Sequence, residues 1–217
     1  MKPEGNALYA ALIHELKNEL GLLSMTLERI PLQGEATHDD AVDGARLLCQ
    51  GVVERLHQAL LVYKASDQPL HPEIDAYSPH ELVQHIQARA TGLTRGRFRI
   101  ETTVSDAVPA LWFFDREWVE MALINAIHNA LAYARSTIRI EADMRAGCLA
   151  LTVRDDSAGY PAHVLDPART GSAPSTTGTG LGLQFARLIA EGHVNQGRRG
   201  ALQLSNDGGA VFRLLLP

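Results

Sequence analysis

The segment Gly178-Thr179-Gly180-Leu181-Gly182-Leu183 constrains this chain more than any other, because three glycines alternate there with threonine and leucine. Apolar residues at helical spacing follow it directly. Glycines let backbone N–H groups approach a ligand closely, and a new helix directs its positive end at the same place. The segment therefore suits phosphate, although a glycine-rich turn that merely starts a helix has the same pattern. The spacing is neither that of a dinucleotide fingerprint nor that of a P-loop.

Composition excludes several classes of function. The 217 residues carry a net charge of −5, so we expect no nucleic-acid binding. No apolar run approaches the ~20 residues of a membrane span, and Cys49 and Cys148 are predicted to be buried thiols in a reducing compartment. The nine histidines lack metal-ligand spacing. We therefore expect a soluble, cytoplasmic chain without a zinc site.

Two long amphipathic helices are predicted at residues 3–30 and 39–65. In the first, apolar residues recur every three or four positions and form a stripe: Leu8, Leu12, Leu16, Leu20, Leu23, Leu27 and Ile30. A turn that begins at Pro31 joins the helices into an antiparallel hairpin. A single hairpin cannot cover both stripes, so residues 1–66 are predicted to form a homodimeric four-helix bundle. Packing of the hairpin onto the rest of the same chain is the alternative.

Within the first helix, His14 points away from the apolar stripe and shares its face with Asn18, one turn further on. An exposed neutral imidazole is a competent nucleophile, and the adjacent Glu15 can accept its proton. Asn18 can orient a water beside a modified His14. A surface histidine with a charged neighbour is, however, usually just a solvated side chain.

Beyond a proline-bearing connector at residues 67–78, the pattern of residues 79–217 becomes α+β. Helices are expected at 80–90, with Ser78 as the cap and Pro79 in the first helical position, at 115–134 and after Gly182. Strands are expected at 97–104, 137–144, 148–154, 202–205 and 211–216, with hairpin turns near 146–147 and 206–209. We therefore place a domain boundary in the connector.

The helix predicted at 115–134 carries Asn125, Asn129 and Tyr133 on one face, four residues apart. Asparagine is unfavourable inside a helix, so two in register indicate a role. Amide oxygens can ligate Mg²⁺, and the tyrosine ring can lie against a purine. A pair of buried, hydrogen-bonded amides would give the same pattern.

An acidic turn follows the strand predicted at 148–154, in the segment from Asp155 to Pro161. A carboxylate fixed at this point can accept a hydrogen bond from an exocyclic amine such as that of adenine. An ordinary strand-to-loop turn with solvated aspartates is the alternative.

Together, these motifs resemble those of two-component sensor histidine kinases, in which a dimerisation and phosphoacceptor hairpin precedes a Bergerat-fold (GHKL-type) ATP-binding domain. The resemblance covers essentially the whole chain. It implies that residues 79–217 form an α/β-sandwich, in which a mixed sheet carries helices on one face. It also implies ATP and Mg²⁺ as cofactors, and the receiver domain of a response regulator as partner.

The resemblance also implies roles for single residues. His14 to Leu20 resembles the H box, so that His14 is the autophosphorylated residue, Glu15 its acidic partner and Asn18 a phosphatase residue. Asn125 to Tyr133 resembles the N box, which implies Mg²⁺ and phosphate contacts for Asn125 and Asn129.

The two remaining motifs concern the nucleotide. Asp155 to Gly159 resembles the first glycine box, with Asp155 as the carboxylate that reads adenine. Gly178 to Leu183 matches the second glycine box. ATP·Mg²⁺ would then lie between the asparagine helix and the glycine segment, with residues 170–177 as a lid.

Several positions depart from the family pattern. Glu19 stands where proline is usual, and Ser157 replaces the first glycine of the D-x-G-x-G pattern. Ala132 stands where a basic residue usually follows the N-box asparagine, although Arg135 one turn on can serve. Ala210 stands where threonine is frequent. These departures bear on ATP affinity and on the autokinase rate.

They also leave two alternatives open: a histidine phosphotransferase with a degenerate nucleotide domain, and a non-enzymatic GHKL-type ATP-binding regulator. The segment before His14 is only thirteen residues long, which leaves no room for a sensor domain. We therefore expect either a catalytic core cut from a longer protein or a separate sensor partner.

Overall fold

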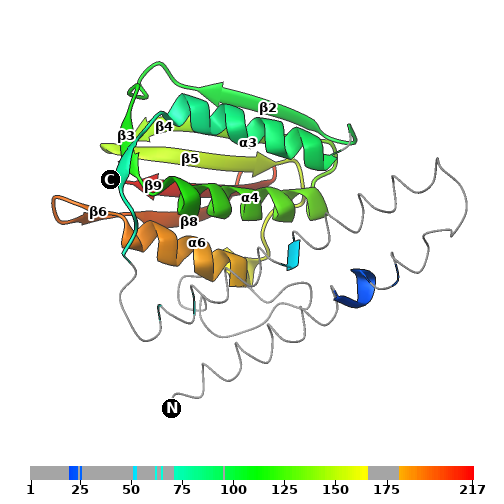
Figure 1. Cartoon of the computed structure of the whole chain (residues 1–217). Coiled ribbons are helices and arrows are strands. Elements are labelled where there is room, and N and C mark those ends of the chain that lie inside the picture. Colours follow the sequence, from blue (N-terminus) through cyan, green and yellow to red (C-terminus); the bar gives the residue numbers. More distant parts are fainter. Residues whose placement is uncertain are drawn as a thin grey trace, which may run out of the picture. The chain divides into compact units, whose positions relative to one another are not determined.

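The computed structural model describes residues 20–23, 25, 51, 52, 62, 65, 71–94, 96–165 and 181–217 (Figure 1). The chain divides into two units, Met1–Asp67 with Pro174–Leu181 and Gln68–Ala173 with Gly182–Pro217. The second unit holds the sheet and the helices described below. Nearly all of the predicted helical hairpin, and with it the four-helix bundle, lies outside the described residues.

A mixed five-stranded sheet forms the centre of the second unit. Its strands, in spatial order, are β2 (Arg99–Val104), β4 (Thr137–Arg145), β5 (Cys148–Asp155), β9 (Ala210–Leu216) and β8 (Ala201–Asn206). β2 and β4 are parallel, and the other neighbours are antiparallel. The β4–β5 turn has positive φ angles at Ala146 (49°) and Gly147 (74°), as a two-residue type I′ turn requires. Both predicted hairpins are therefore present.

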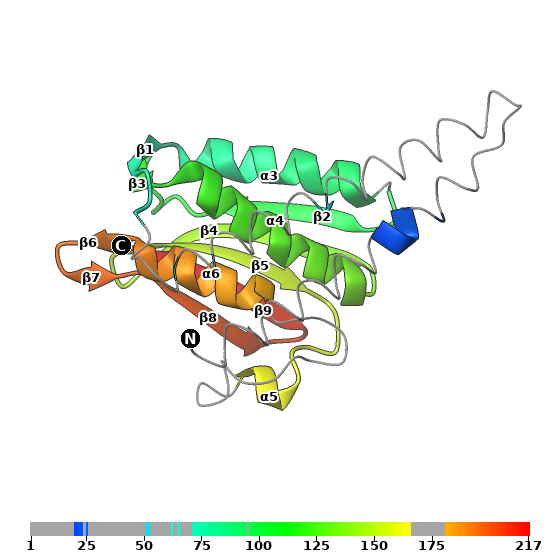
Figure 2. The same cartoon turned by 60° about the horizontal axis from the view of Figure 1, so that its bottom comes forward.

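Three helices cover one face of this sheet: α3 (Pro79–Thr94), α4 (Arg116–Tyr133) and α6 (Leu181–Gly192) (Figures 1 and 2). A single turn of helix, α5 (Ala162–Leu165), follows β5. The core lies between the layers and includes Leu82, Ile86, Leu123, Ile127, Ile138, Ile140, Leu149, Leu151, Phe185, Ile189, Phe212 and Leu214. Because strand residues alternate between faces, the helix-facing residues of β4 and β9 are buried and most of their neighbours are not. The expected mixed sheet with helices on one face is confirmed.

Local capping sets where α3 and α4 begin. The Ser78 hydroxyl accepts a hydrogen bond from the Glu81 N–H at 3.3 Å, so the predicted cap is present and Pro79 opens α3. Asp115 caps α4, because its Oδ1 accepts from the Trp118 N–H at 3.0 Å. α4 also supplies the crossover that a parallel β2–β4 pair requires.

Two small ribbons were not predicted. β1 (Asp75–Tyr77) pairs with β3 (Trp112–Phe114), and β6 (Val194–Asn195) pairs with β7 (Arg198–Arg199). β1 lies in the predicted connector, so the last residues of that connector pair with a strand of the second unit. The Trp112 indole N–H donates to the Leu216 carbonyl at 3.2 Å and fastens the β1–β3 ribbon to the end of β9. None of the helices in the described part of the chain has the length and apolar character of a membrane span.

Candidate functional site

The polar face of α4 meets the first turn of α6 at one point. The Asn125 side chain lies against Gly182, and a Cβ at position 182 would clash with the amide group of Asn125. The Nδ2 of Asn125 is buried and has no hydrogen-bond partner within the described residues. An unpaired buried donor costs on the order of 1–3 kcal/mol, so this group indicates a place where a ligand binds.

The two other predicted residues of α4 are accessible. Asn129 lies one turn beyond Asn125 and is half-buried, and the ring of Tyr133 is 55% exposed. Both therefore remain free to meet a ligand on the face that Asn125 occupies. In the described part of the chain, no cluster of three histidine, cysteine, aspartate or glutamate residues exists that could hold a metal alone. A magnesium ion at this face would therefore rely on few protein oxygens, as magnesium at phosphate sites usually does.

The turn after β5 fixes the carboxylate of Asp155. Its Oδ1 accepts hydrogen bonds from the N–H groups of Ser157 at 2.9 Å and Ala210 at 3.1 Å. Its Oδ2 has no hydrogen bond from the described residues. One oxygen is thus held by the backbone, and the other can accept from a ligand.

Ser157 closes the same turn. It is 8% exposed, and its hydroxyl accepts from the Gly159 N–H at 3.0 Å. Gly159 has a φ of 88°, which favours glycine. Ser157, which stands where the resemblance implies a glycine, therefore stabilises the turn through its side chain.

The turn also holds the β8–β9 hairpin in place. The Asn206 Oδ1 accepts from the Tyr160 N–H at 2.7 Å, and its Nδ2 donates to the Tyr160 carbonyl at 3.0 Å. Gly209 packs so closely against Asp155 that a Cβ there would clash with the Asp155 carbonyl. Burial, and secondarily the charge of Asp155, raises the pKa of the Tyr160 phenol, which therefore stays neutral. The loops around Asp155 form one preorganised structure.

The neighbouring Asp156 has a structural function that the sequence analysis missed. Its carboxylate accepts from the Ser136 hydroxyl at 2.7 Å and from the N–H groups of Arg135 at 2.7 Å and Thr137 at 3.2 Å. Partial burial alone would raise the pKa of Asp156, but these bonds outweigh it and hold the pKa below its ordinary value. The only sequence signal was a second aspartate, with a serine and a threonine after the helix.

Several predicted residues are not described. His14, Glu15, Asn18, Glu19, Gly178, Thr179 and Gly180 lie outside the described residues, as does the predicted lid at 170–177. Leu181 begins α6, and Gly182 and Leu183 follow in its first turn, where both are half-buried. A helix therefore begins at the glycine segment as expected, but it starts at Leu181, one residue before Gly182, and not after it.

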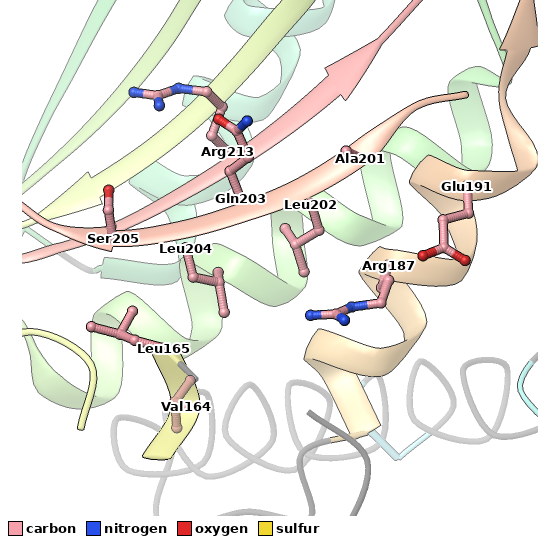
Figure 3. A pocket seen from close by; sticks show the side chains of 10 residues that line it. All are labelled: Val164, Leu165, Arg187, Glu191, Ala201, Leu202, Gln203, Leu204, Ser205 and Arg213. Carbon is pink, nitrogen blue, oxygen red and sulfur yellow. The ribbon is translucent and has the colours of Figure 1, made fainter. Parts of the chain in front are cut away.

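A cavity of about 440 Å³ lies elsewhere, beside β8 (Figure 3). Leu202 and Leu204 of β8 and Leu165 of α5 form its apolar side, and Arg187 and Glu191 of α6 line the opposite side. None of the candidate site residues lines it. It is therefore separate from the site built on Asn125 and Asp155.

Comparison with known proteins identifies this arrangement. Residues 114–217 match the family model described as "Histidine kinase-, DNA gyrase B-, and HSP90-like ATPase". They form a histidine kinase-type ATPase domain. The match begins at the end of β3 and therefore contains α4, the Asp155 turn and α6.

Relatives extend the likeness to most of the chain. The sensor protein RstB of Escherichia coli is 32% identical over 181 residues, which cover 76% of this chain and 39% of RstB. The chain thus spans well under half of this curated relative. The Acinetobacter baumannii histidine kinase AdeS has a similar fold, with a TM-score of 0.65 at 18% identity over 94% of this chain and 96% of that structure. Full-length ShkA, solved in complex with AMPPNP, gives a TM-score of 0.65 at 20% identity over 97% of this chain and 45% of ShkA.

The departures from the family pattern can now be located in the ATPase domain. Ala210 lacks a hydroxyl, but its backbone N–H still holds Asp155. Ala132 is exposed on α4 and adds no charge there, and the side chain of Arg135 is also exposed. The framework around Asp155 is therefore intact, and the loss of a basic residue is confined to the end of α4.

Proposed function

We propose that this chain is the catalytic core of a two-component histidine autokinase that binds ATP·Mg²⁺. The observation that carries the proposal is the buried Nδ2 of Asn125, which lies against Gly182 of α6 and has no hydrogen-bond partner among the residues that the structure describes. In a histidine kinase-type ATPase domain, such an orphaned donor suits a ligand rich in acceptor oxygens. The residues present therefore fit a nucleoside triphosphate.

Different residues would contact different parts of the nucleotide. Asp155 Oδ2 would accept from the adenine amine, and the ring of Tyr133 would cover the base. Asn129 and Asn125 would hold Mg²⁺ and phosphate, and the backbone of Gly178 to Leu183 would surround the phosphates. Mg²⁺ would supply neutralisation of the charge that develops on the transferred phosphoryl group.

The proposed acceptor is His14. Its imidazole would attack the γ-phosphoryl group while Glu15 takes its proton, the bond between the γ-phosphorus and the β–γ bridging oxygen would break, and ADP would leave. Asn18 would orient water for a phosphatase reaction. The phosphoryl group would pass to an aspartate of a response-regulator receiver. Residues 1–66 would form the homodimer, and residues 67–78 would link them to residues 79–217. The reaction would take place in the cytoplasm. The signal would come from a separate sensor partner or from a further segment.

The test is a phosphorylation time course with γ-labelled ATP, in which unsubstituted chain and His14→Ala are compared. We expect an acid-labile, base-stable label in the unsubstituted chain and less than a few per cent of it in the variant. Label that persists in His14→Ala would exclude this acceptor. Mixing with a receiver domain should then remove the label from the kinase.

The main alternative is a histidine phosphotransferase whose nucleotide domain no longer functions. This alternative was suggested by the departures from the family pattern at Ser157, Ala132 and Ala210. Ser157 and Ala210 form hydrogen bonds within the Asp155 turn, so these two departures no longer support it. The exposed Ala132 still favours it. A non-enzymatic ATP-binding regulator is the second alternative. Calorimetry with ATP separates the first from our proposal, and absence of phosphohistidine despite ATP binding would favour the second.

A further inference from the structure

A buried histidine joins the far ends of α4 and α6. His193 directly follows α6 and is 2% exposed. Its Nε2 lies 3.0 Å from the backbone N of Asp115, the cap of α4, and its Nδ1 lies 2.7 Å from the Ile189 carbonyl. A backbone N–H can only donate, so Nε2 accepts and Nδ1 carries the proton that goes to Ile189. The geometry therefore fixes both the tautomer and the neutral state.

Asp115 connects the same junction to the segment that precedes β1. Its Oδ1 accepts from Trp118, and its Oδ2 accepts from the Glu73 N–H at 2.9 Å. The backbone of His193 is held as well, because its carbonyl accepts from the Gly200 N–H at 2.9 Å. A Cβ at Gly200 would clash with the Ala190 carbonyl, so this close approach of the two backbones requires glycine. His193 thus has a fixed position relative to the start of α4.

The two helices are antiparallel and touch at a second point. α4 runs from Asp115 toward Asn125, and α6 runs from Gly182 back toward His193 (Figure 2). Asp115 and Asn125 are ten residues apart, which corresponds to about 15 Å of helix. Gly182 and His193 are eleven residues apart, which corresponds to about 16–17 Å. These lengths match, so the His193–Asp115 bond and the Gly182–Asn125 contact lie at corresponding ends of the two helices.

We propose that His193 is a positioning residue for the nucleotide site, and that it acts through the axial register of α6 on α4. This inference rests on the proposed function, because it assumes that Asn125 and the first turn of α6 bind phosphate. A shift of α6 along its axis would move the Gly182 backbone away from Asn125. His193 would therefore influence nucleotide affinity although about 15 Å of helix separates it from the site.

A matched pair of variants tests the proposal. In His193→Gln, the amide oxygen can occupy the place of Nε2 and still accept from the Asp115 N–H. In His193→Asn, the amide nitrogen can occupy the place of Nδ1 and still donate to Ile189, but the link to α4 is lost. We expect His193→Asn to weaken ATP·Mg²⁺ binding in calorimetry about tenfold, the equivalent of one hydrogen bond, and His193→Gln to change it little.

The matching spectroscopic readout needs no nucleotide. The side-chain amide resonance of Asn125 in ¹H–¹⁵N spectra should move in His193→Asn and stay in place in His193→Gln. Equal effects of the two variants on affinity, or an unmoved Asn125 resonance in His193→Asn, would overturn the proposal. If the unsubstituted chain binds no ATP, the proposed function fails, and the Asn125 resonance still decides whether His193 sets the register.

A measurement on the unsubstituted chain guards against a variant that does not fold. Linkage is reciprocal, so if the His193 bond favours nucleotide, nucleotide must stabilise the bond. Hydrogen exchange of the Asp115 amide should therefore slow when ATP·Mg²⁺ is added. An unchanged exchange rate at saturating nucleotide would contradict the coupling.

Discussion

The adjacent residues Asp155 and Asp156 show that hydrogen-bond partners determine what a carboxylate does in this structure. Asp155 uses one carboxylate oxygen for the backbone, and its other oxygen has no hydrogen bond from the described residues, whereas Asp156 uses both oxygens within the fold. The two side chains are chemically identical, and only the hydrogen-bond donors around them differ. Substitutions at the two positions should therefore have opposite consequences.

We expect Asp155→Asn to weaken nucleotide binding by tenfold or more with little loss of stability. The amide oxygen can still accept from the backbone, but the amide NH₂ would face the adenine amine, donor against donor. Calorimetry with ATP and a urea titration measure the two effects.

Asp156→Asn is the matched control. It should lower the unfolding free energy by about 1 kcal/mol, because charge-assisted bonds at a partly exposed site are lost, and it should leave the Kd for ATP nearly unchanged. A large effect of Asp156→Asn on the Kd, without one from Asp155→Asn, would reverse our assignment.

His193 predicts a pH dependence of stability. Burial lowers the pKa of the His193 imidazole, despite the opposing bond to Ile189 and the charge of Asp115. The unfolded chain therefore takes up a proton near pH 6.5 while the folded chain stays neutral. The contribution of neutral His193 to the unfolding free energy is therefore fully present above about pH 6.5. It is lost as the pH falls from there toward the pKa of His193 in the folded chain. Urea titrations between pH 7.5 and 5 should show this slope, and the slope should be absent in His193→Gln.

At the scale of elements, Gly182 matters because α6 begins against α4. Gly182→Ala should reduce nucleotide affinity at least tenfold, because its Cβ would displace the Asn125 amide. Gly92→Ala in α3 is the control, since nothing lies within 4 Å of the added Cβ. Gly92→Ala should raise stability by about 0.5–1 kcal/mol and leave the affinity as it was. Equal affinities in the two variants would show that the Asn125–Gly182 contact is not part of the site.

The predicted elements were those whose signals are local. The cap of α3, both hairpins and the helix at the glycine segment each depend on residues a few positions apart, so the sequence was sufficient for them. The parallel pairing of β2 with β4 and the β1–β3 ribbon depend on contacts between distant segments. Short strands of two or three residues also carry too little periodicity to be recognised.

The same distinction applies to the site. Asn125, Asn129, Asp155 and Gly182 could be selected because their motifs are short and ordered along the chain. The contact of Asn125 with Gly182 could not be inferred from those motifs alone, and neither could the bond between Asp115 and His193, 78 residues apart. Ser157 was taken as a departure that puts ATP affinity in doubt, because the sequence did not show that its hydroxyl holds the turn.

At the scale of the whole molecule, binding should stabilise the second unit as a body, because the site draws on α4, α6 and the β5 turn together. A ligand at 100 times its Kd adds about 2.7 kcal/mol to the unfolding free energy, which corresponds to roughly 5–10 °C in Tm for a domain of this size. We expect this shift with ATP and Mg²⁺ and a much smaller one with ATP and EDTA. A shift that is equal with and without the chelator would argue against a metal at Asn125 and Asn129.

Both tryptophans of the chain flank Asp115, with Trp112 bonded to Leu216 on one side and Trp118 in the first turn of α4 on the other. The tryptophan fluorescence of this protein, excited selectively over that of its five tyrosines, consequently originates beside the point where His193 meets α4. A change in emission wavelength or quenching would report on that junction without any label. Stopped-flow mixing with nucleotide could then measure the rate at which binding near Gly182 changes the surroundings of the tryptophans at the opposite end of the helix pair.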